Sequence, residues 1–408
     1  MKQFTIPNIY RSNLISAIKS KRKQEDKLKK DFTPTLLDFG SVQFYLARHF
    51  GFCYGVENAI EIAFKTIDEN QGKRIFLLSE MIHNPQVNAD LLARGVQFLQ
   101  DTYGKQLIDF NTITKEDIVL IPAFGTTLDI EKMLIEKGIA IEKYNTTCPF
   151  VEKVWNRSEQ IAQKGYSIVI HGKPKHEETR ATFSHAAQHT PTVIVNDMAE
   201  TIELAKYITG EKAEHLFYTE FKGKYSEGFN VTTDLQRFGV VNQTTQLATD
   251  TQAISDYLKQ VVMQHFQLTD TTIAERFADT RDTLCYATND NQTAVKGLLE
   301  TEADLALVIG GYNSSNTSHL VELCEQKLPT YFIDSTEKIV SKQELVHCNW
   351  ITKECSTVLN YLPEKTPVKI LITSGASCPD ALVEAVIAKV ASFYNQEHLI
   401  ENCIAQFQ

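Results

Sequence analysis

Three cysteines occupy similar places in the sequence, each just before a run that is typical of a helix. Cys53 lies in HFGFCYGVENAI, Cys148 in NTTCPFVEKV and Cys285 in DTLCYATNDNQ. A helix N-terminus carries partial positive charge and free N–H groups, so a thiol there should lose its proton more easily. Thiolates are ligands for zinc, cuprous copper and iron–sulfur clusters. Either the three thiols converge on one metal centre and leave one of its positions open, or they are unrelated structural cysteines.

The spacing of these cysteines predicts three lobes. The intervals are 95 and 137 residues, and they become similar once the polar, aromatic region 205–240 is set aside as an insertion. This insertion is interpreted as a hairpin or flap. The predicted parts are a basic N-terminal extension (1–40), lobe 1 with Cys53 (41–147), lobe 2 with Cys148 and the insertion at about 205–240 (148–283), lobe 3 with Cys285 (284–390) and a C-terminal tail (391–408).

The elements that must position such residues recur along the chain. A short β-branched strand is followed by a small polar or Gly-rich turn and an amphipathic helix, at 118–138, 166–185, 304–328 and 368–394. Strands that alternate with helices predict an α/β fold of βαβ units with small, mostly parallel sheets. Ligands of such sheets gather at the carboxyl ends of the strands, which is where these turns lie.

Polar side chains are concentrated in these turns. They are His83, His176, Glu178, Gln243, Thr244, Thr245, Asn313, Ser314, Ser315, Asn316 and Ser377. Hydroxyls, amides and free N–H groups at helix N-termini form anion sites, and together with imidazoles they would suit a phosphate or a diphosphate. Ser, Asn and Thr are also ordinary helix caps, so each turn taken alone has a purely structural interpretation. The nucleotide-binding motifs GxxxxGK[ST] and a well-placed GxGxxG are absent from the sequence.

Composition excludes several classes of protein. The net charge of −10 argues against a general nucleic-acid binder, and no apolar run is long enough for a membrane span. Residues 1–30 hold nine lysines and arginines against Glu25 and Asp26, a net charge of +7, so the remainder carries −17. This basic arm is expected to be a mobile or surface-docked extension, with a transit peptide as the alternative. Because no secretory signal is recognisable, the eight cysteines are expected to be reduced and the protein cytoplasmic.

Taken together, these segments resemble the LytB/IspH family, the 4-hydroxy-3-methylbut-2-enyl diphosphate reductases. The matching segments are GFCYGVENAI, MIHNPQV, TTCPFVEKV, HEETRAT, NQTT, CYATNDNQ, GYNSSNTSHL and TSGASCPDALV, in the family's order over roughly 45–390. The resemblance implies three α/β lobes in a pseudo-threefold trefoil around a central [4Fe–4S] cluster. It also implies reduction of an allylic diphosphate by two electrons and two protons, with loss of water, to isopentenyl and dimethylallyl diphosphates, the last step of the non-mevalonate isoprenoid pathway.

The resemblance also assigns roles to individual residues. Cys53, Cys148 and Cys285 match the cluster ligands, Glu178 matches the proton donor, and Thr244 matches a residue that positions this carboxylate and the substrate hydroxyl. The matches to substrate-binding residues are His83, His176, Ser314, Ser315, Asn316 and Ser377. The electrons are expected to come from a ferredoxin- or flavodoxin-type protein, which the basic arm could dock.

One position departs from the family pattern. Phe124 stands in an AFGTT turn where the family usually has a second diphosphate-binding histidine. Because phenylalanine cannot donate a hydrogen bond to phosphate, Thr126, Thr127 or a nearby lysine is expected to compensate. Two other functions remain open, namely a zinc hydrolase that uses the same three thiolates with Glu178 as base, and a non-catalytic phosphate-binding α/β protein.

Overall fold

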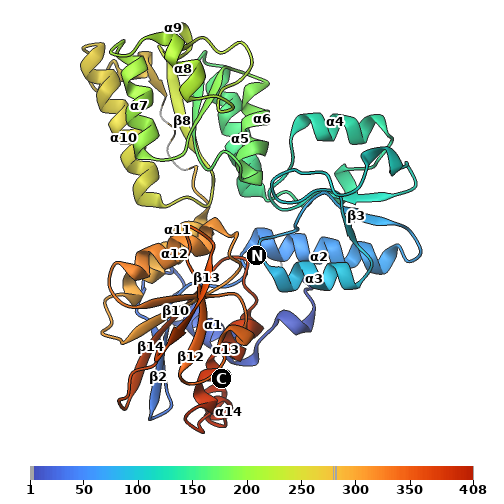
Figure 1. Ribbon diagram of the computed structural model, residues 1–408, viewed down its shortest axis with the longest axis vertical. Helices are drawn as coiled ribbons and strands as arrows, with labels where there is room; N and C mark the ends of the chain where they lie inside the picture. The colour runs from blue at the N-terminus through green and yellow to red at the C-terminus, as the bar shows by residue number, and fades with distance from the viewer. Residues whose placement is uncertain (1–3, 279, 281–282, 408) are drawn as a thin grey trace. The chain divides into compact units, whose positions relative to one another are not determined.

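The computed structural model describes residues 4–278, 280 and 283–407 (Figure 1). Its chain divides into two compact units. Unit 1 comprises Met1–Glu61, Ile82–Asp90 and Tyr286–Gln408, and unit 2 comprises Ile62–Met81 and Leu91–Cys285. The chain therefore leaves and re-enters unit 1 twice. Each unit is described separately below.

Unit 1 is built on a five-stranded sheet with the strand order β1-β2-β14-β10-β11. Its strands are β1 (Thr35–Asp38), β2 (Val42–Leu46), β10 (Leu305–Ile309), β11 (Thr330–Ile333) and β14 (Val368–Ser374). β2 pairs with β14 in parallel, with Val42 opposite Val368, so segments from the two ends of the sequence share one sheet (Figure 1). Only β1 runs antiparallel to its neighbour. Every residue of β10 is buried, as expected for a central strand that is covered on both faces.

Helices follow the strands of this sheet as the sequence predicts. The predicted unit 304–328 is β10 followed by α12 (Ser315–Glu325), and the unit 368–394 is β14 followed by α13 (Asp380–Ser392). The remaining long helices are α1 (Asn13–Glu25), α2 (Tyr54–Glu69, shared between the units), α3 (Pro85–Ala93, also shared), α11 (Tyr286–Leu298) and α14 (Leu399–Phe407). Both strand-to-helix turns lie at the carboxyl ends of neighbouring parallel strands, which places them at one edge of the sheet.

The N-terminal arm is docked on unit 1. α1 packs against α13 and α14 (Figure 1), and it buries Leu14, Ile15 and Ile18. Ser12 caps the helix by accepting a hydrogen bond from the Ile15 N–H at 2.8 Å. Of the two expectations for this arm, mobile or docked, the structure shows the docked one.

A separate hairpin completes unit 1, formed by β12 (Glu344–Cys348) and β13 (Cys355–Leu359). Cys348 and Cys355 lie opposite each other in its register and form a disulfide. The expectation that all eight cysteines are reduced is therefore wrong for this pair. The antiparallel ladder places the two residues face to face across a turn, and this juxtaposition was not visible in the spacing of the cysteines.

Unit 2 contains two small parallel sheets. The first has the order β4-β3-β5, with strands β3 (Ile75–Leu77), β4 (Gln97–Phe98) and β5 (Ile118–Leu120). The second has the order β7-β6-β8-β9, with strands β6 (Ser167–His171), β7 (Thr192–Val195), β8 (Phe238–Asn242) and β9 (Phe277–Ala278). Its helices are α4 (Leu128–Glu136), α5 (Pro149–Ala162), α6 (Glu177–Ala187), α7 (Met198–Ile208) and α10 (Ala248–His265). The predicted units 118–138 and 166–185 correspond to β5–α4 and β6–α6.

The region 205–240 is helical rather than a hairpin or flap. It contains α8 (Glu214–Glu220) and α9 (Val231–Asp234), and it leads into β8. Phe217 is fully buried and stacks on both Phe221 and Phe229 at centroid distances of 4.9 and 5.4 Å. This aromatic cluster joins the apolar core under the second sheet of unit 2, so the region is an integral part of the unit's core.

The predicted α/β class with small, mostly parallel sheets is confirmed. Among the described residues, the two sheets of unit 2 are parallel and the sheet of unit 1 is parallel except for β1, which lies in the same sheet as β2, β10 and β14. No helix in the described part of the chain is both long and apolar enough to cross a membrane.

Candidate active site

Cys53 lies immediately before α2, in the position that the sequence predicts. Its N–H donates to the Ala376 carbonyl at 3.2 Å, and its carbonyl accepts the Glu57 N–H at 3.0 Å, the first helical bond. Burial raises the pKa of the Cys53 thiol, although hydrogen bonds from the Val56 and Gly55 N–H groups act to lower it. The prediction that this thiol loses its proton more easily than usual is therefore wrong for Cys53 without a bound ligand, because burial affects its pKa more than the helix N-terminus does.

The turn after β10 forms the N-terminus of α12. Ser314 caps the helix, since its Oγ accepts hydrogen bonds from the Thr317 N–H at 3.2 Å and from Thr317 Oγ1 at 2.9 Å. Ser315 and Asn316 begin the helix, and all three predicted residues are buried. Ser314 therefore has the structural role of a helix cap. Ser315 and Asn316 lie in the first turn of α12, where free N–H groups and the helix dipole favour anions.

Asn316 links this turn to the one after β14. Its Oδ1 accepts the Ala376 N–H at 3.0 Å and lies 3.4 Å from Asn291 Nδ2. Its Nδ2 is buried and has no hydrogen-bond partner among the described residues. Because a buried amide donor without a partner costs free energy, it calls for an acceptor that binds there. An oxygen of an anionic ligand would supply one.

His83 and Ser377 come together although 294 residues separate them. Ser377 Oγ donates to the His83 carbonyl at 3.0 Å, and both residues are buried. A Cβ at Gly311 would stand 2.3 Å from the same carbonyl oxygen, so only glycine lets this backbone approach so closely. Unit 1 therefore gathers the predicted residues His83, Ser314, Ser315, Asn316 and Ser377 beside the Cys53 backbone.

In unit 2, a buried carboxylate occupies the start of α6. Glu178 is only 1% exposed, and its Oε1 accepts a hydrogen bond from the Thr244 N–H, in the turn after β8. The Thr244 carbonyl in turn accepts the Cys285 N–H at 3.3 Å. One short turn therefore holds both the predicted proton donor and the backbone of a predicted ligand, and it does so through its main chain.

His176 is the N-cap of α6. Its Nδ1 accepts the Glu178 N–H at 3.2 Å, so in this arrangement the ring proton of a neutral His176 lies on Nε2. The ring packs edge-to-face on Phe124, with centroids 5.7 Å apart. The structure thus gives His176 a capping role and places it against the residue that departs from the family pattern.

Cys148 is the N-cap of α5, and Pro149 takes the first helical position. The Cys148 N–H donates to the Ala123 carbonyl at 2.9 Å, which ties this thiol's backbone to the AFGTT turn. Trp155 of the same helix stacks on His185 at a centroid distance of 3.7 Å. Burial lowers the pKa of His185 to about 4, so this histidine is neutral at pH 7.

Two further polar residues support these turns. The sequence predicts Gln243 only as one of the polar turn residues, and it gives no role to Asn291. Gln243 is fully buried, and its Oε1 accepts hydrogen bonds from the Lys173 N–H at 3.1 Å and from Thr179 Oγ1 at 3.0 Å. It therefore joins the turns after β6 and β8. Asn291 faces Asn316 from α11. Both residues stand in segments that resemble the family, NQTT and CYATNDNQ, which is the signal that could have identified them.

Comparison with known proteins decides the family. The family described as "LytB protein" matches residues 44–391. The chain belongs to the LytB family. A Picosynechococcus protein named 4-hydroxy-3-methylbut-2-enyl diphosphate reductase is 40% identical over 86% of this chain and 84% of its own length. A protein of the same name from Crocosphaera subtropica is 37% identical over 95% and 90%.

Solved structures show the same fold. The E-1-hydroxy-2-methyl-but-2-enyl-4-diphosphate reductase from Plasmodium falciparum is 22% identical, covers 85% of this LytB chain and 87% of its own, and aligns with a TM-score of 0.61. A structure of (E)-4-hydroxy-3-methyl-but-2-enyl diphosphate reductase covers 85% and 98% with a TM-score of 0.50 at 24% identity. The predicted membership of the LytB family and the predicted fold class are therefore confirmed.

The three LytB cysteines are distributed over both units. Cys53 belongs to unit 1, whereas Cys148 and Cys285 belong to unit 2, and none of the three forms a disulfide in the part of the chain that the structure describes. Within the described residues, no three His, Cys, Asp or Glu side chains are grouped closely enough to hold a metal ion. Convergence of the three thiols accordingly stays a prediction.

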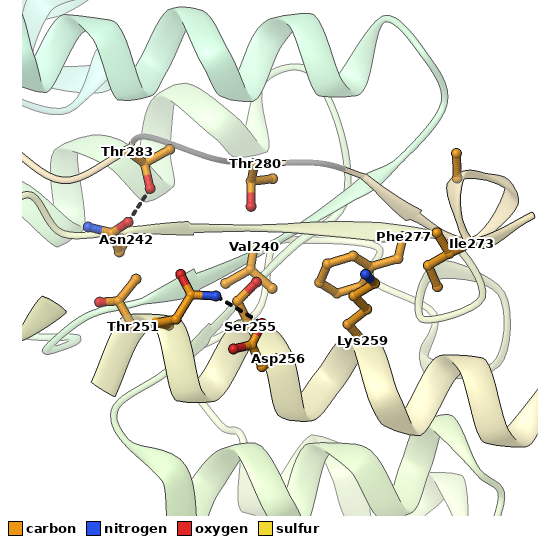
Figure 2. A pocket seen from close by; sticks show the side chains of 12 residues that line it. Val240, Asn242, Thr251, Ser255, Asp256, Lys259, Ile273, Phe277, Thr280 and Thr283 are labelled. Atoms are coloured by element: carbon orange, nitrogen blue, oxygen red, sulfur yellow. Dashed lines mark hydrogen bonds between the residues drawn. The ribbon is translucent and has the colours of Figure 1, made fainter. Parts of the chain in front are cut away.

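Unit 2 contains a cavity of about 480 Å³, and none of the predicted site residues lines it. Figure 2 shows side chains of α10, among them Thr251, Ser255 and Lys259, on one side and β8 on the other. Thr283 donates to Asn242 Oδ1 at its edge. The side chains that line this cavity do not form a recognisable catalytic or metal-binding arrangement.

Proposed function

We propose that this chain reduces (E)-4-hydroxy-3-methylbut-2-enyl diphosphate to isopentenyl and dimethylallyl diphosphates. The substrate takes up two electrons and two protons, its allylic C–O bond breaks, and the hydroxyl leaves as water. The observation that carries the proposal is the buried Glu178 carboxylate, which is held by the same turn that holds Cys285. The names of the relatives that cover most of this chain support the same reaction.

The residues of unit 1 are proposed to bind the diphosphate. Ser315, Asn316 and Ser377 present hydroxyl and amide groups at two strand-to-helix turns, and His83 lies beside them. The Asn316 Nδ2, which lacks a partner among the described residues, would donate to a phosphate oxygen. Charge-assisted hydrogen bonds of this kind are stronger than those between neutral groups, and the dipole of α12 adds to them.

Glu178 is proposed to deliver a proton to the leaving hydroxyl. Since Oε1 accepts the Thr244 N–H, a protonated Glu178 carries its proton on Oε2, and that oxygen is the donor. The bond to a main-chain N–H holds the carboxyl in one orientation without needing the Thr244 side chain. The Thr244 hydroxyl can then contact the substrate hydroxyl, as the family match implies.

The three cysteines are proposed to hold a [4Fe–4S] cluster. The donor set fits such a group, because Cys53, Cys148 and Cys285 each precede a helix and form no disulfide among the described residues. Backbone N–H groups of α2 also point at the Cys53 sulfur. A bound cation would deprotonate the Cys53 thiol in spite of its raised pKa. When bound, the cluster would supply Lewis acidity to the hydroxyl oxygen and pass on electrons one at a time.

The partners and location complete the proposal. A ferredoxin- or flavodoxin-type protein is expected to supply the electrons, and a cytoplasmic location stays a prediction from the sequence. The direct test is anaerobic incubation of the purified protein with the allylic diphosphate and a small reductant such as dithionite with methyl viologen. Formation of isopentenyl and dimethylallyl diphosphates is the expected result. Absence of both products from protein with its full complement of iron and sulfide would contradict the proposal.

A further inference from the structure

The basic residues of the N-terminal arm differ in their partners. Some are neutralised by ion pairs, namely Lys19 with Asp380 at 2.7 Å, Arg22 with Asp31 at 3.0 Å and Lys29 with Asp290 at 3.0 Å. Lys23, Lys27 and Lys30 are exposed instead, and no acidic side chain among the described residues lies within 4 Å of them. Leu28, between the last two, is 75% exposed. We call Lys23, Lys27, Leu28 and Lys30 the lysine patch.

The lysine patch stands on an ordered turn. Asp26 accepts the N–H groups of Lys30 at 3.1 Å and of Asp31 at 2.9 Å. Arg22 Nη2 donates to the Thr33 carbonyl at 2.9 Å, which closes the turn onto the end of α1. The bonding within the turn therefore fixes the backbone, while the lysine side chains and Leu28 remain in solvent. Such a surface needs little ordering before a partner binds it.

The turn runs along α11. A Cβ at Gly297 would stand 2.5 Å from the Phe32 carbonyl oxygen, so the chain beyond the patch touches the helix backbone there. At the other end of α11, Lys29 reaches Asp290 and lies over the Tyr286 ring, 5.6 Å from its centroid. The Tyr286 hydroxyl accepts the Tyr54 N–H at 3.4 Å.

The two tyrosines beside the lysine patch are sequence neighbours of proposed cluster ligands. Tyr54 directly follows Cys53, and Tyr286 directly follows Cys285. The lysine patch thus borders the starts of two helices whose preceding thiols are proposed cluster ligands. Lys29, within the turn that carries the patch, adjoins the Tyr286 ring, which is 37% exposed, so an electron that enters here would reach residues next in sequence to two of the proposed ligands.

We infer that the lysine patch is the docking surface for an acidic one-electron donor protein with an apolar centre to its binding face. This inference rests on the proposed reductase function, which needs two electrons for each turnover and therefore two donor encounters. Unpaired lysines around an exposed leucine suit such a partner, because charge speeds the encounter and an apolar centre supplies contact. The arm carries +7 against −17 for the rest of the chain, so its net charge favours an acidic partner where that of the remainder does not.

The test compares two reductants and two triple variants of the full holoenzyme. The patch variant is Lys23→Glu, Lys27→Glu and Lys30→Glu, and the control variant is Lys132→Glu, Lys164→Glu and Lys327→Glu. The control lysines are also exposed and lie outside the arm, so both variants change the charge equally. Turnover is measured with dithionite and methyl viologen, and separately with reduced ferredoxin and reduced flavodoxin, at low and high salt.

The patch variant should lose at least about tenfold in kcat/KM for the protein donor, keep its turnover with dithionite, and lose most of the salt dependence that the unaltered enzyme shows. The control variant should resemble the unaltered enzyme. A milder patch variant with glutamine at the three positions should lose less, and Leu28→Ser should lose a few-fold. Equal losses in the patch and control variants, or no loss in the patch variant, would overturn the inference.

Other outcomes are equally decisive. An enzyme that turns over with dithionite but accepts electrons from neither protein donor would overturn the inference while leaving the proposed function intact. An enzyme that turns over with no reductant would overturn the proposed function itself. If the patch variant instead changes the oligomeric state in light scattering, the surface joins two copies of this chain and the inference is wrong.

Discussion

The polar cluster of unit 1 and that of unit 2 differ in the kind of group they present. In unit 1 the predicted residues are hydroxyls, an amide and an imidazole, and the Asn316 Nδ2 is a buried donor that lacks a partner among the described residues. In unit 2 the central group is the Glu178 carboxyl, which is an acceptor and already receives a main-chain N–H. Donors suit an acceptor-rich anion, whereas a carboxyl suits proton transfer. The proposal therefore assigns diphosphate binding to the polar cluster of unit 1 and proton transfer to the Glu178 carboxyl of unit 2.

The largest effect on activity is expected when the Glu178 carboxyl of unit 2 is replaced by a neutral amide. Glu178→Gln should lower kcat by about 10²–10⁴-fold with little change in KM, because the amide can accept the Thr244 N–H but has no acidic proton to give. Anaerobic steady-state kinetics with dithionite and methyl viologen measures both constants. Glu177→Gln is the matched control, since the neighbouring Glu177 accepts a hydrogen bond from Ser79 instead, and it should keep kcat within a few-fold.

The corresponding change in unit 1 should act on binding. Asn316→Asp replaces a donor with a negative charge where the diphosphate is proposed to bind, so KM should rise by roughly tenfold or more. Substrate titrations of both variants under the same conditions make the comparison direct. If Asn316→Asp lowered kcat as much as Glu178→Gln while leaving KM unchanged, the division of labour between the units would be wrong.

The stability of unit 2 should depend on pH through His185. In the folded protein its pKa is held near 4, whereas an unfolded histidine titrates near 6.5, so the unfolded state binds more protons between these values. Stability from this group is therefore present above pH 6.5 and is lost as the pH falls toward 4. His185→Phe keeps a ring against Trp155 and removes the titration.

Thermal unfolding between pH 7 and pH 4 measures this effect. The unfolding temperature of the unaltered protein should fall by roughly 2–4 °C more than that of His185→Phe, the shift that about 1 kcal/mol produces in a domain of this size. His265→Phe, at an exposed position on α10, serves as the control and should follow the unaltered protein. Parallel curves for all three proteins would show that the neutral His185 does not contribute.

The smallest effect is expected at Phe124. Since hydroxyls near this turn are predicted to replace the missing histidine, Phe124→His should change KM by less than about threefold. A restored charge-assisted hydrogen bond would give about tenfold or more, corresponding to the 1.5–3 kcal/mol of such bonds. Thr126→Val, measured beside it, should raise KM instead. A large gain in affinity for Phe124→His would mean that nothing compensates for the histidine.

Local sequence patterns were sufficient to predict the elements that carry the site. The four βα units and the helix starts after Cys53, Cys148 and Cys285 are where the patterns of strand, turn and helix place them. These features depend on residues only a few positions apart. The same is true of Ser314, whose capping role follows from its residue type and its place before α12.

Features that depend on distant residues could not be predicted in the same way. The contact of Ser377 with the His83 carbonyl and the pairing of β2 with β14 each join segments about 300 residues apart. The raised pKa of Cys53 results from burial by the folded chain, which outweighs the local helix N-terminus. In the region 205–240, Phe217 packs on Phe221 and Phe229, and this aromatic clustering overrides a polar sequence with weak helical periodicity.

The most direct measurement is iron and acid-labile sulfide analysis of the protein purified without oxygen, compared with Cys53→Ser, Cys148→Ser and Cys285→Ser. The account predicts four iron ions and four sulfides per chain, as a [4Fe–4S] cluster requires, and loss or marked depletion of both in each variant. Cys324→Ser, at a buried thiol outside the site, should retain them. Stoichiometric zinc without sulfide, or full iron and sulfide in all three variants, would contradict the central claim that these thiols hold one redox centre.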